Sequence, residues 1–126
     1  MASRIIIVDD EVEIAEVLEK FLLKQGFETL KFTKAEQAIK AMEEGQKYDL
    51  LITDMKMPGM TGIDILRAKN NLKNTASVII LTGSIDIERY QESGTLHEVG
   101  CTLDDVCGKP VDLFYLLEMV KRKLKL

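Results

Sequence analysis

The chain has 126 residues, enough for one domain, and its 46% hydrophobic and 30% charged residues are typical of a globular protein. Its net charge of −4 excludes the strongly basic surface of nucleic-acid-binding proteins, so we expect no direct contact with nucleic acid. The longest apolar run, residues 113–117, is too short to span a membrane, and nothing resembles a signal peptide. We therefore expect a cytoplasmic protein that makes no membrane contact.

Five segments have the pattern of β-strands. Four are short, continuous apolar runs, which favours strands buried on both faces of a parallel sheet. The second segment, FETLKF, has one polar face. In chain order the predicted strands are residues 5–8, 27–32, 50–53, 78–82 and 106–107.

Helical patterns lie between these strands, with apolar residues three and four positions apart. Thr33 and Glu36 predict a capping box at the start of the second helix, and Asp112 is expected to cap the last one. The clearest helical segments are residues 14–22, 35–42, 63–66 and 113–124.

Residues 84–103 are the hardest part of the chain to assign. Leu96 and Val99 suggest a helix, but the stretch is polar and contains Gly94 and Gly100. We expect this segment to be the least stable part of the domain and to become ordered when the protein is activated.

The alternation of strands and helices predicts an α/β fold with a parallel sheet and helices on both of its faces. In such a sheet all strands point the same way, and ligands bind at the edge formed by their carboxyl ends. The residues that end or follow the predicted strands at this edge are Asp9, Asp10, Thr53, Asp54, Thr82, Gly83, Lys109 and Pro110.

Three carboxylates therefore meet at one edge, and two of them ~4 Å apart repel by about 4 kcal/mol at a protein-like dielectric. A hard cation removes this repulsion, and oxygen ligands without imidazole or thiolate favour Mg²⁺ or Mn²⁺. A carboxylate beside such a cation is a nucleophile toward phosphorus, with Lys109 and Thr82 in position to contact a phosphoryl group. The alternatives are a solvated turn for Asp9 and Asp10, a plain salt bridge for Lys109 and strand packing for Thr82.

A second acidic pair, Asp104 and Asp105, precedes the last strand and is expected at the opposite edge as a solvated strand start. The single histidine, His97, is expected at the surface, and Cys101 and Cys107 are expected to be reduced and packed. This set of residues does not make a zinc site.

Four motifs, IIIVDDE, LLITDMKMPGMTG, VIILTG and CGKP, together resemble the receiver domain of two-component response regulators. The resemblance covers nearly the whole chain, so residues 1–126 are expected to form one receiver domain. It implies a flavodoxin-like, doubly wound sheet of five parallel strands in the order 2-1-3-4-5. It also implies transfer of a phosphoryl group to an aspartate, with Mg²⁺ as cofactor and a sensor histidine kinase or phosphotransfer protein as donor.

The resemblance also implies roles for single residues. Asp54 matches the phosphoacceptor, Asp10 a direct metal ligand, and Asp9 a ligand acting through water. Asp54 and the backbone carbonyl of Lys56 would complete the protein's share of the metal shell. Such a domain is not a conventional enzyme, because it catalyses only its own phosphorylation and dephosphorylation.

Thr82 matches the hydroxyl residue that takes part in the switch of this family. Lys109 matches the lysine that pairs with the phosphoryl group. In the family this lysine is followed by a proline, and the peptide bond between the two is often cis. One departure is Val106, because receivers commonly carry Tyr or Phe three positions before this lysine. A valine is too small and too stiff to act as an aromatic toggle. The stretch from Thr82 to Lys109 is also a few residues longer than the family pattern.

Two other classes of protein are the alternatives. A phosphatase of the haloacid dehalogenase type needs DxD at the end of the first strand, where this chain has DDE. A receiver-like interaction module that is never phosphorylated would not need Asp9, Asp10, Asp54, Thr82 and Lys109 together. The favoured interpretation is a phosphorylated receiver that controls a downstream protein or output domain.

Overall fold

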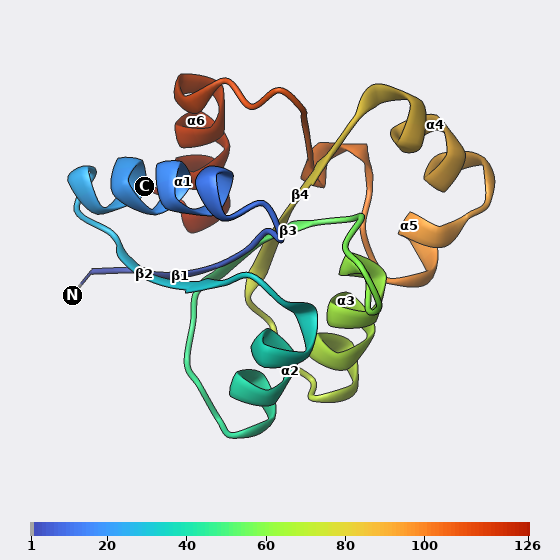
Figure 1. Cartoon of the computed structure of the whole chain (residues 1–126), viewed down its shortest axis with the longest axis horizontal. Helices are drawn as coiled ribbons and strands as arrows, with labels where there is room; N and C mark the ends of the chain where they lie inside the picture. Colours follow the sequence, from blue (N-terminus) through green and yellow to red (C-terminus); the bar gives the residue numbers. More distant parts are fainter. Residues whose placement is uncertain (1) are drawn as a thin grey trace.

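In a computed structural model, strands and helices alternate along the chain, as expected (Figure 1). The structure describes residues 2–126, except for the side chains of residues 84 and 85. The strands are β1 (Arg4–Val8), β2 (Glu28–Phe32), β3 (Leu50–Asp54), β4 (Ser77–Thr82) and β5 (Val106–Gly108). The helices are α1 (Val12–Lys24), α2 (Ala35–Glu43), α3 (Gly62–Asn71), α4 (Ser84–Glu92), α5 (Thr95–Glu98) and α6 (Leu113–Leu124), with a 3-10 turn, η1 (Leu103–Asp105).

All strand pairs are parallel, and the strand order is β2-β1-β3-β4-β5. This confirms the predicted flavodoxin-like, doubly wound α/β fold. Because the order reverses direction after β1, the carboxyl ends of β1 and β3 lie side by side at the point where the sheet changes direction. Val8 of β1 pairs with Thr53 of β3, which fixes the register beside the predicted site.

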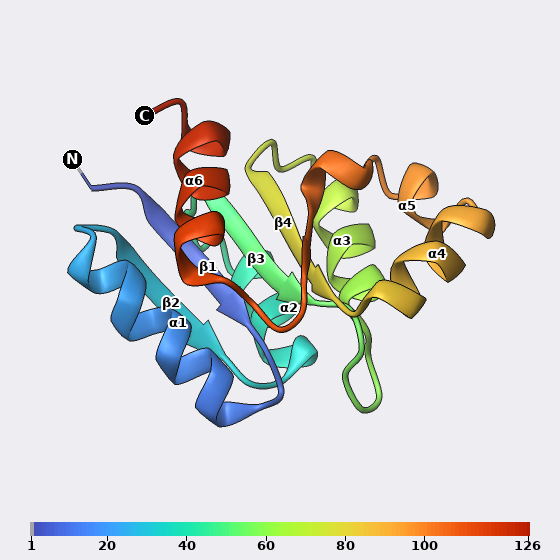
Figure 2. The same ribbon diagram turned by 90° about the horizontal axis from the view of Figure 1, so that it is seen from above.

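The sheet lies between two layers of helices (Figures 1 and 2). Successive residues of the central strands belong to opposite apolar clusters. Ile5 and Ile7 pack with α1 and α6 on one face, whereas Ile6 and Val8 pack with α2, α3 and α5 on the other. This two-sided burial explains why the central strands are continuously apolar rather than alternating.

The helix caps only partly match their predictions. Asp112 caps α6, because its side chain accepts hydrogen bonds from the backbone N–H of Phe114 at 2.9 Å and of Tyr115 at 3.1 Å. The capping box predicted at Thr33 and Glu36 is wrong: α2 begins one residue later, with Lys34 at its N-cap and no side-chain cap.

Residues 84–103 are more regular than expected. They form α4 and α5, which meet at Gly94 in the left-handed conformation (φ 73°), and Leu96 and Val99 are buried in the core. The segment thus contains two helices, and its low stability and its ordering on activation stay predictions.

The second acidic pair precedes β5, at the edge opposite the predicted site, and Asp104 is exposed as expected. Asp105 differs from the expectation, because it is half-buried, caps η1 through the Thr102 N–H and forms an ion pair with Lys123. His97 is exposed, and both cysteines are free and buried. None of the helices in the described part of the chain is long and apolar enough to cross a membrane.

Candidate functional site

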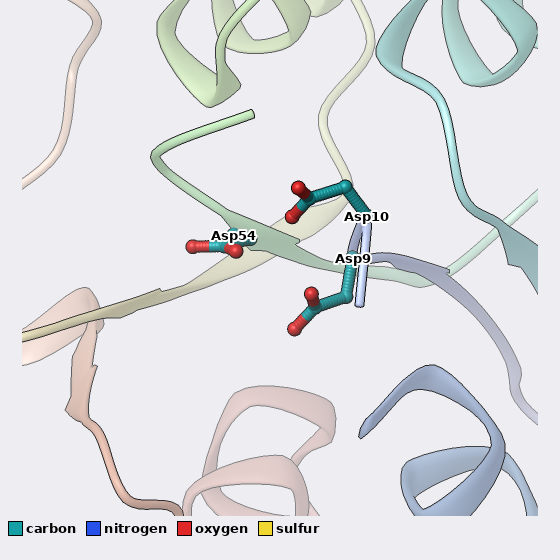
Figure 3. A group of neighbouring side chains, drawn as sticks. All are labelled: Asp9, Asp10 and Asp54. Carbon is teal, nitrogen blue, oxygen red and sulfur yellow. The ribbon is translucent and has the colours of Figure 1, made fainter. Parts of the chain in front are cut away.

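Three carboxylates gather where β1 and β3 end, and Figure 3 shows Asp9 and Asp10 directed toward Asp54. Each offers an oxygen atom, and these atoms all lie within 4.8 Å of one another. Asp54 is the last residue of β3, the strand at the middle of the sheet. The structure therefore brings these three acids together at this edge of the sheet, as the sequence predicted.

Asp54 is only 5% exposed because every residue of β3 is buried. The hydroxyl of Thr53 donates to the backbone carbonyl of Asp54 at 2.9 Å, and the N–H of Met55 donates to the carbonyl of Leu81 at 3.2 Å. Both bonds hold the peptide that joins Asp54 to Met55, so the backbone is fixed directly after the residue that carries the carboxylate.

Lys109 follows β5 and reaches across the edge to the acids. Its Nζ lies 3.0 Å from Oδ2 of Asp54 and 3.4 Å from Oδ2 of Asp9. Burial lowers the pKa of Lys109, but the hydrogen bond and charge of Asp54, together with Asp9, outweigh burial and raise it above its ordinary value. The ammonium therefore stays charged and offsets one of the three carboxylates.

Asp9 is fully buried, and one of its oxygens accepts a hydrogen bond from the Glu11 N–H at 2.9 Å. Burial raises the pKa of this carboxyl, as does the charge of Asp54, while the Glu11 N–H and Lys109 act in the opposite direction. Asp10 is half-buried and lies closer to solvent. The two adjacent acids thus occupy different environments, as expected if only one of them is a direct ligand.

The donor set fits a small hard cation. The formal charge of three carboxylates and one ammonium is −2 at this edge. The three acidic residues offer carboxylate oxygens as ligand atoms. Mg²⁺ binds oxygens at about 2.1 Å, so ligand oxygens stand at most about 4.2 Å apart, close to the span seen here.

Thr82 and Lys56 complete the predicted residues. Thr82 ends β4, one residue after Leu81, which pairs with Asp54 in the sheet. It is 4% exposed, and its carbonyl accepts a hydrogen bond from the Lys109 N–H at 3.0 Å. Lys56 lies two residues after Asp54 in the loop of residues 55–61, and its side chain turns away to pair with Asp86 of α4 at 2.9 Å. The peptide between Lys109 and Pro110 is cis, as the resemblance implied.

An apolar groove of about 650 Å³ opens beside Lys109. It runs between α1 and the start of α6, and Glu13 adds one charge at its side. Its apolar lining consists of Ile14, Val17, Leu18, Pro110, Val111 and Leu113.

A family model described as the response regulator receiver domain matches residues 5–121 of the chain. The chain belongs to this family. The receiver domain is 32% identical to the sporulation initiation phosphotransferase F of Bacillus subtilis (strain 168) over 126 residues, which cover 100% of this chain and 97% of that protein. It is 34% identical to the regulatory protein VanR of Enterococcus faecium over 125 residues, 99% of this chain, but spans only about half (51%) of VanR's length.

Solved structures agree with this assignment. The chemotaxis response regulator CheY4 of Vibrio cholerae superposes with a TM-score of 0.84 at 25% identity, covering 98% of this chain and 100% of that one. A response regulator receiver domain protein from Clostridium thermocellum gives a TM-score of 0.84 at 28% identity, covering 98% and 94% of the two chains.

Two residues of this receiver domain were missed by sequence reasoning. A Cβ atom added to Gly62 would lie 2.4 Å from the carbonyl oxygen of Asp54, so the start of α3 presses directly on the end of β3. Its place at the end of the LLITDMKMPGMTG motif was the available signal. The second is Asp86, for which the sequence offered no signal, because its partner Lys56 is 30 positions away and is revealed only by the fold.

Proposed function

We propose that Asp54 accepts a phosphoryl group from a phosphohistidine of a sensor histidine kinase or phosphotransfer protein. The observation that carries this proposal is the position of the Asp54 carboxylate, 3.0 Å from the Lys109 ammonium and within 4.8 Å of the Asp9 and Asp10 oxygens. A carboxylate placed between a cation and a metal-binding acid pair is a nucleophile suited to an anionic phosphoryl group.

In the proposed step, an oxygen of Asp54 attacks phosphorus and the P–N bond to the donor histidine breaks. The imidazole leaves with the bonding electrons, and an acyl phosphate remains on Asp54. Lys109 pairs with a phosphoryl oxygen once the group has transferred, and the hydroxyl of Thr82 donates to another. Water later attacks the same phosphorus, the bond between phosphorus and the Asp54 oxygen breaks, and inorganic phosphate leaves while the Asp54 carboxylate is restored.

Asp9, Asp10, Asp54 and the carbonyl of Lys56 are the residues proposed to hold Mg²⁺, with Mn²⁺ as an alternative. The metal supplies charge neutralisation for the phosphoryl oxygens during transfer. Asp10, which is half-buried and lies closer to solvent, is proposed as the direct ligand. Asp9, which is buried and accepts a hydrogen bond from the Glu11 N–H, is proposed as the ligand that acts through water.

The apolar groove beside Lys109 is the proposed docking surface for the donor protein, because it brings an apolar contact next to the acceptor carboxylate. Residues 1–126 are proposed to act as one receiver domain in the cytoplasm. Phosphorylation would then change its contact with a downstream protein or output domain.

The test is incubation with acetyl phosphate and Mg²⁺, followed by intact mass measurement. We expect one added phosphoryl group that hydroxylamine removes, as it does from an acyl phosphate. Asp54→Asn should not be labelled, whereas Asp104→Asn, which changes an exposed acid at the opposite edge, should be labelled like the wild type. Equal labelling of Asp54→Asn would reject the acceptor, and no labelling of the wild type would favour a receiver-like module that is never phosphorylated.

A further inference from the structure

An ion pair connects the loop after the proposed phosphoacceptor to α4. Nζ of Lys56 lies 2.9 Å from Oδ1 of Asp86, and these side chains are 63% and 19% exposed. Lys56 is two residues beyond Asp54, and Asp86 lies in the first turn of α4. The pair therefore ties α4 to the segment whose charge would change on phosphorylation.

The rest of α4 is held weakly. Within residues 86–92, the part of α4 whose side chains are described, no side chain is fully buried, whereas α1 and α6 each bury several. The Lys56–Asp86 contact is the one ion pair found for these α4 side chains. A helix with so little buried surface depends more on such a tether than a well-packed helix does.

Tyr90 lies four positions after Asp86, on the same face of α4. Its ring is half-buried against the core layer that also packs against Val106. Burial raises the pKa of Tyr90, and so do the charges of Asp86 and, more weakly, Asp54. The contact between Asp86 and Lys56 places this face of α4 beside the loop that follows Asp54.

We propose that Lys56 is a latch that holds α4 in place through Asp86, and that a phosphoryl group on Asp54 opens it by competing for the Lys56 ammonium. This inference rests on the proposed phosphorylation of Asp54. A phosphoryl group carries about two negative charges against one on Asp86, and the exposed Lys56 side chain is free to turn toward it. Release of Asp86 then loosens the α4 face that carries Tyr90, which passes the signal outward without an aromatic residue at position 106.

Hydrogen exchange of the backbone amides of residues 86–92 tests the latch. Loss of an exposed ion pair should speed their exchange about two- to fivefold. We expect this acceleration in the wild type after treatment with acetyl phosphate and Mg²⁺, and in unphosphorylated Asp86→Asn. Phosphorylation of Asp86→Asn should add no further acceleration. The control variant Glu88→Gln, which removes an exposed carboxylate from the same helix, should behave like the wild type.

The phosphoryl content of each sample is measured by mass, so that two failures are distinguished. Full phosphorylation with unchanged or slower exchange across residues 86–92 would overturn the latch while leaving the proposed function intact. Absence of phosphorylation would reject both the proposed function and the proposed opening of the latch by a phosphoryl group. Unphosphorylated Asp86→Asn that exchanges like the wild type would show that the ion pair does not hold α4, and would also overturn the latch.

Discussion

The ammonium of Lys109 lies 3.0 Å from the carboxylate of Asp54, although 55 positions separate the two residues in the sequence. This contact joins the end of β3 to the end of β5 across β4, and the same ammonium also reaches Asp9 at 3.4 Å. One positive charge therefore holds together two buried carboxylates that would otherwise repel each other.

Replacement of Lys109 by methionine should destabilise the metal-free protein, because it leaves Asp9 and Asp54 without a counter-ion. We expect the free energy of unfolding to fall by about 1–3 kcal/mol, with the lower end favoured by the partial exposure of the lysine. Urea denaturation in the presence of a chelator measures this difference. Lys121→Met, at an exposed position of α6, is the control, and equal stability of the two variants would contradict the counter-ion role.

Magnesium should stabilise the folded protein, because the acids proposed to hold it lie close together only when the strand ends do. At ten times the dissociation constant the gain is about 1.4 kcal/mol. Asp10→Ala should lose most of this gain and Asp9→Ala less of it, as measured by thermal unfolding with and without Mg²⁺. Asp104→Ala should keep the full gain. An undiminished magnesium effect in Asp10→Ala would remove that residue from the ligand set.

Gly62→Ala should damage both stability and phosphorylation. The added Cβ would lie 2.4 Å from the Asp54 carbonyl oxygen and 3.0 Å from Cα of Met55, so the backbone must move at the acceptor. We expect a loss of about 1–3 kcal/mol in the free energy of unfolding and slower labelling by acetyl phosphate. Gly108→Ala is the matched control, because no atom lies within 4 Å of its added Cβ. A Gly62→Ala protein with normal stability would show that the contact relaxes without cost.

Cys101 should make stability depend on pH in the alkaline range. Burial raises the pKa of this thiol from 9.0 to about 11, with Asp105 acting in the same direction and Lys69 and Lys123 against it. The folded protein holds this proton more tightly than the unfolded chain does. The protonated thiol therefore contributes fully to the free energy of unfolding below pH 9, and this contribution is lost as the pH rises to about 11. The loss amounts to about 3 kcal/mol.

Urea denaturation of the wild type and of Cys101→Ala between pH 8 and about pH 11 measures this contribution. The free energy of unfolding of the wild type should fall more steeply than that of the variant. Parallel pH profiles would mean that the thiol titrates with an ordinary pKa in the folded state.

The sequence was enough to predict which residues meet at the site, because continuous apolar runs marked the strands and parallel topology brings their ends together. Asp54 and Lys109 could be placed at one edge in this way without knowledge of any side-chain conformation. The start of α2 was misplaced by one residue, because the structure places Lys34 and not Thr33 at the N-cap, where no side chain caps the helix. The Lys56–Asp86 contact was beyond prediction, because it depends on the path of a loop and not on any periodic pattern.

The site draws its side chains from the ends of β1, β3, β4 and β5, so only a fragment that spans residues 9–109 contains all of them. Synthesis delivers Asp9 and Asp10 first, then Asp54 and Thr82, and Lys109 last of these five residues. A nascent chain therefore carries the acids long before it carries their counter-ion, and it cannot present the complete acceptor until the whole sheet has closed. If Asp54 accepts a phosphoryl group as proposed, labelling of Asp54 would also report that the whole sheet has folded.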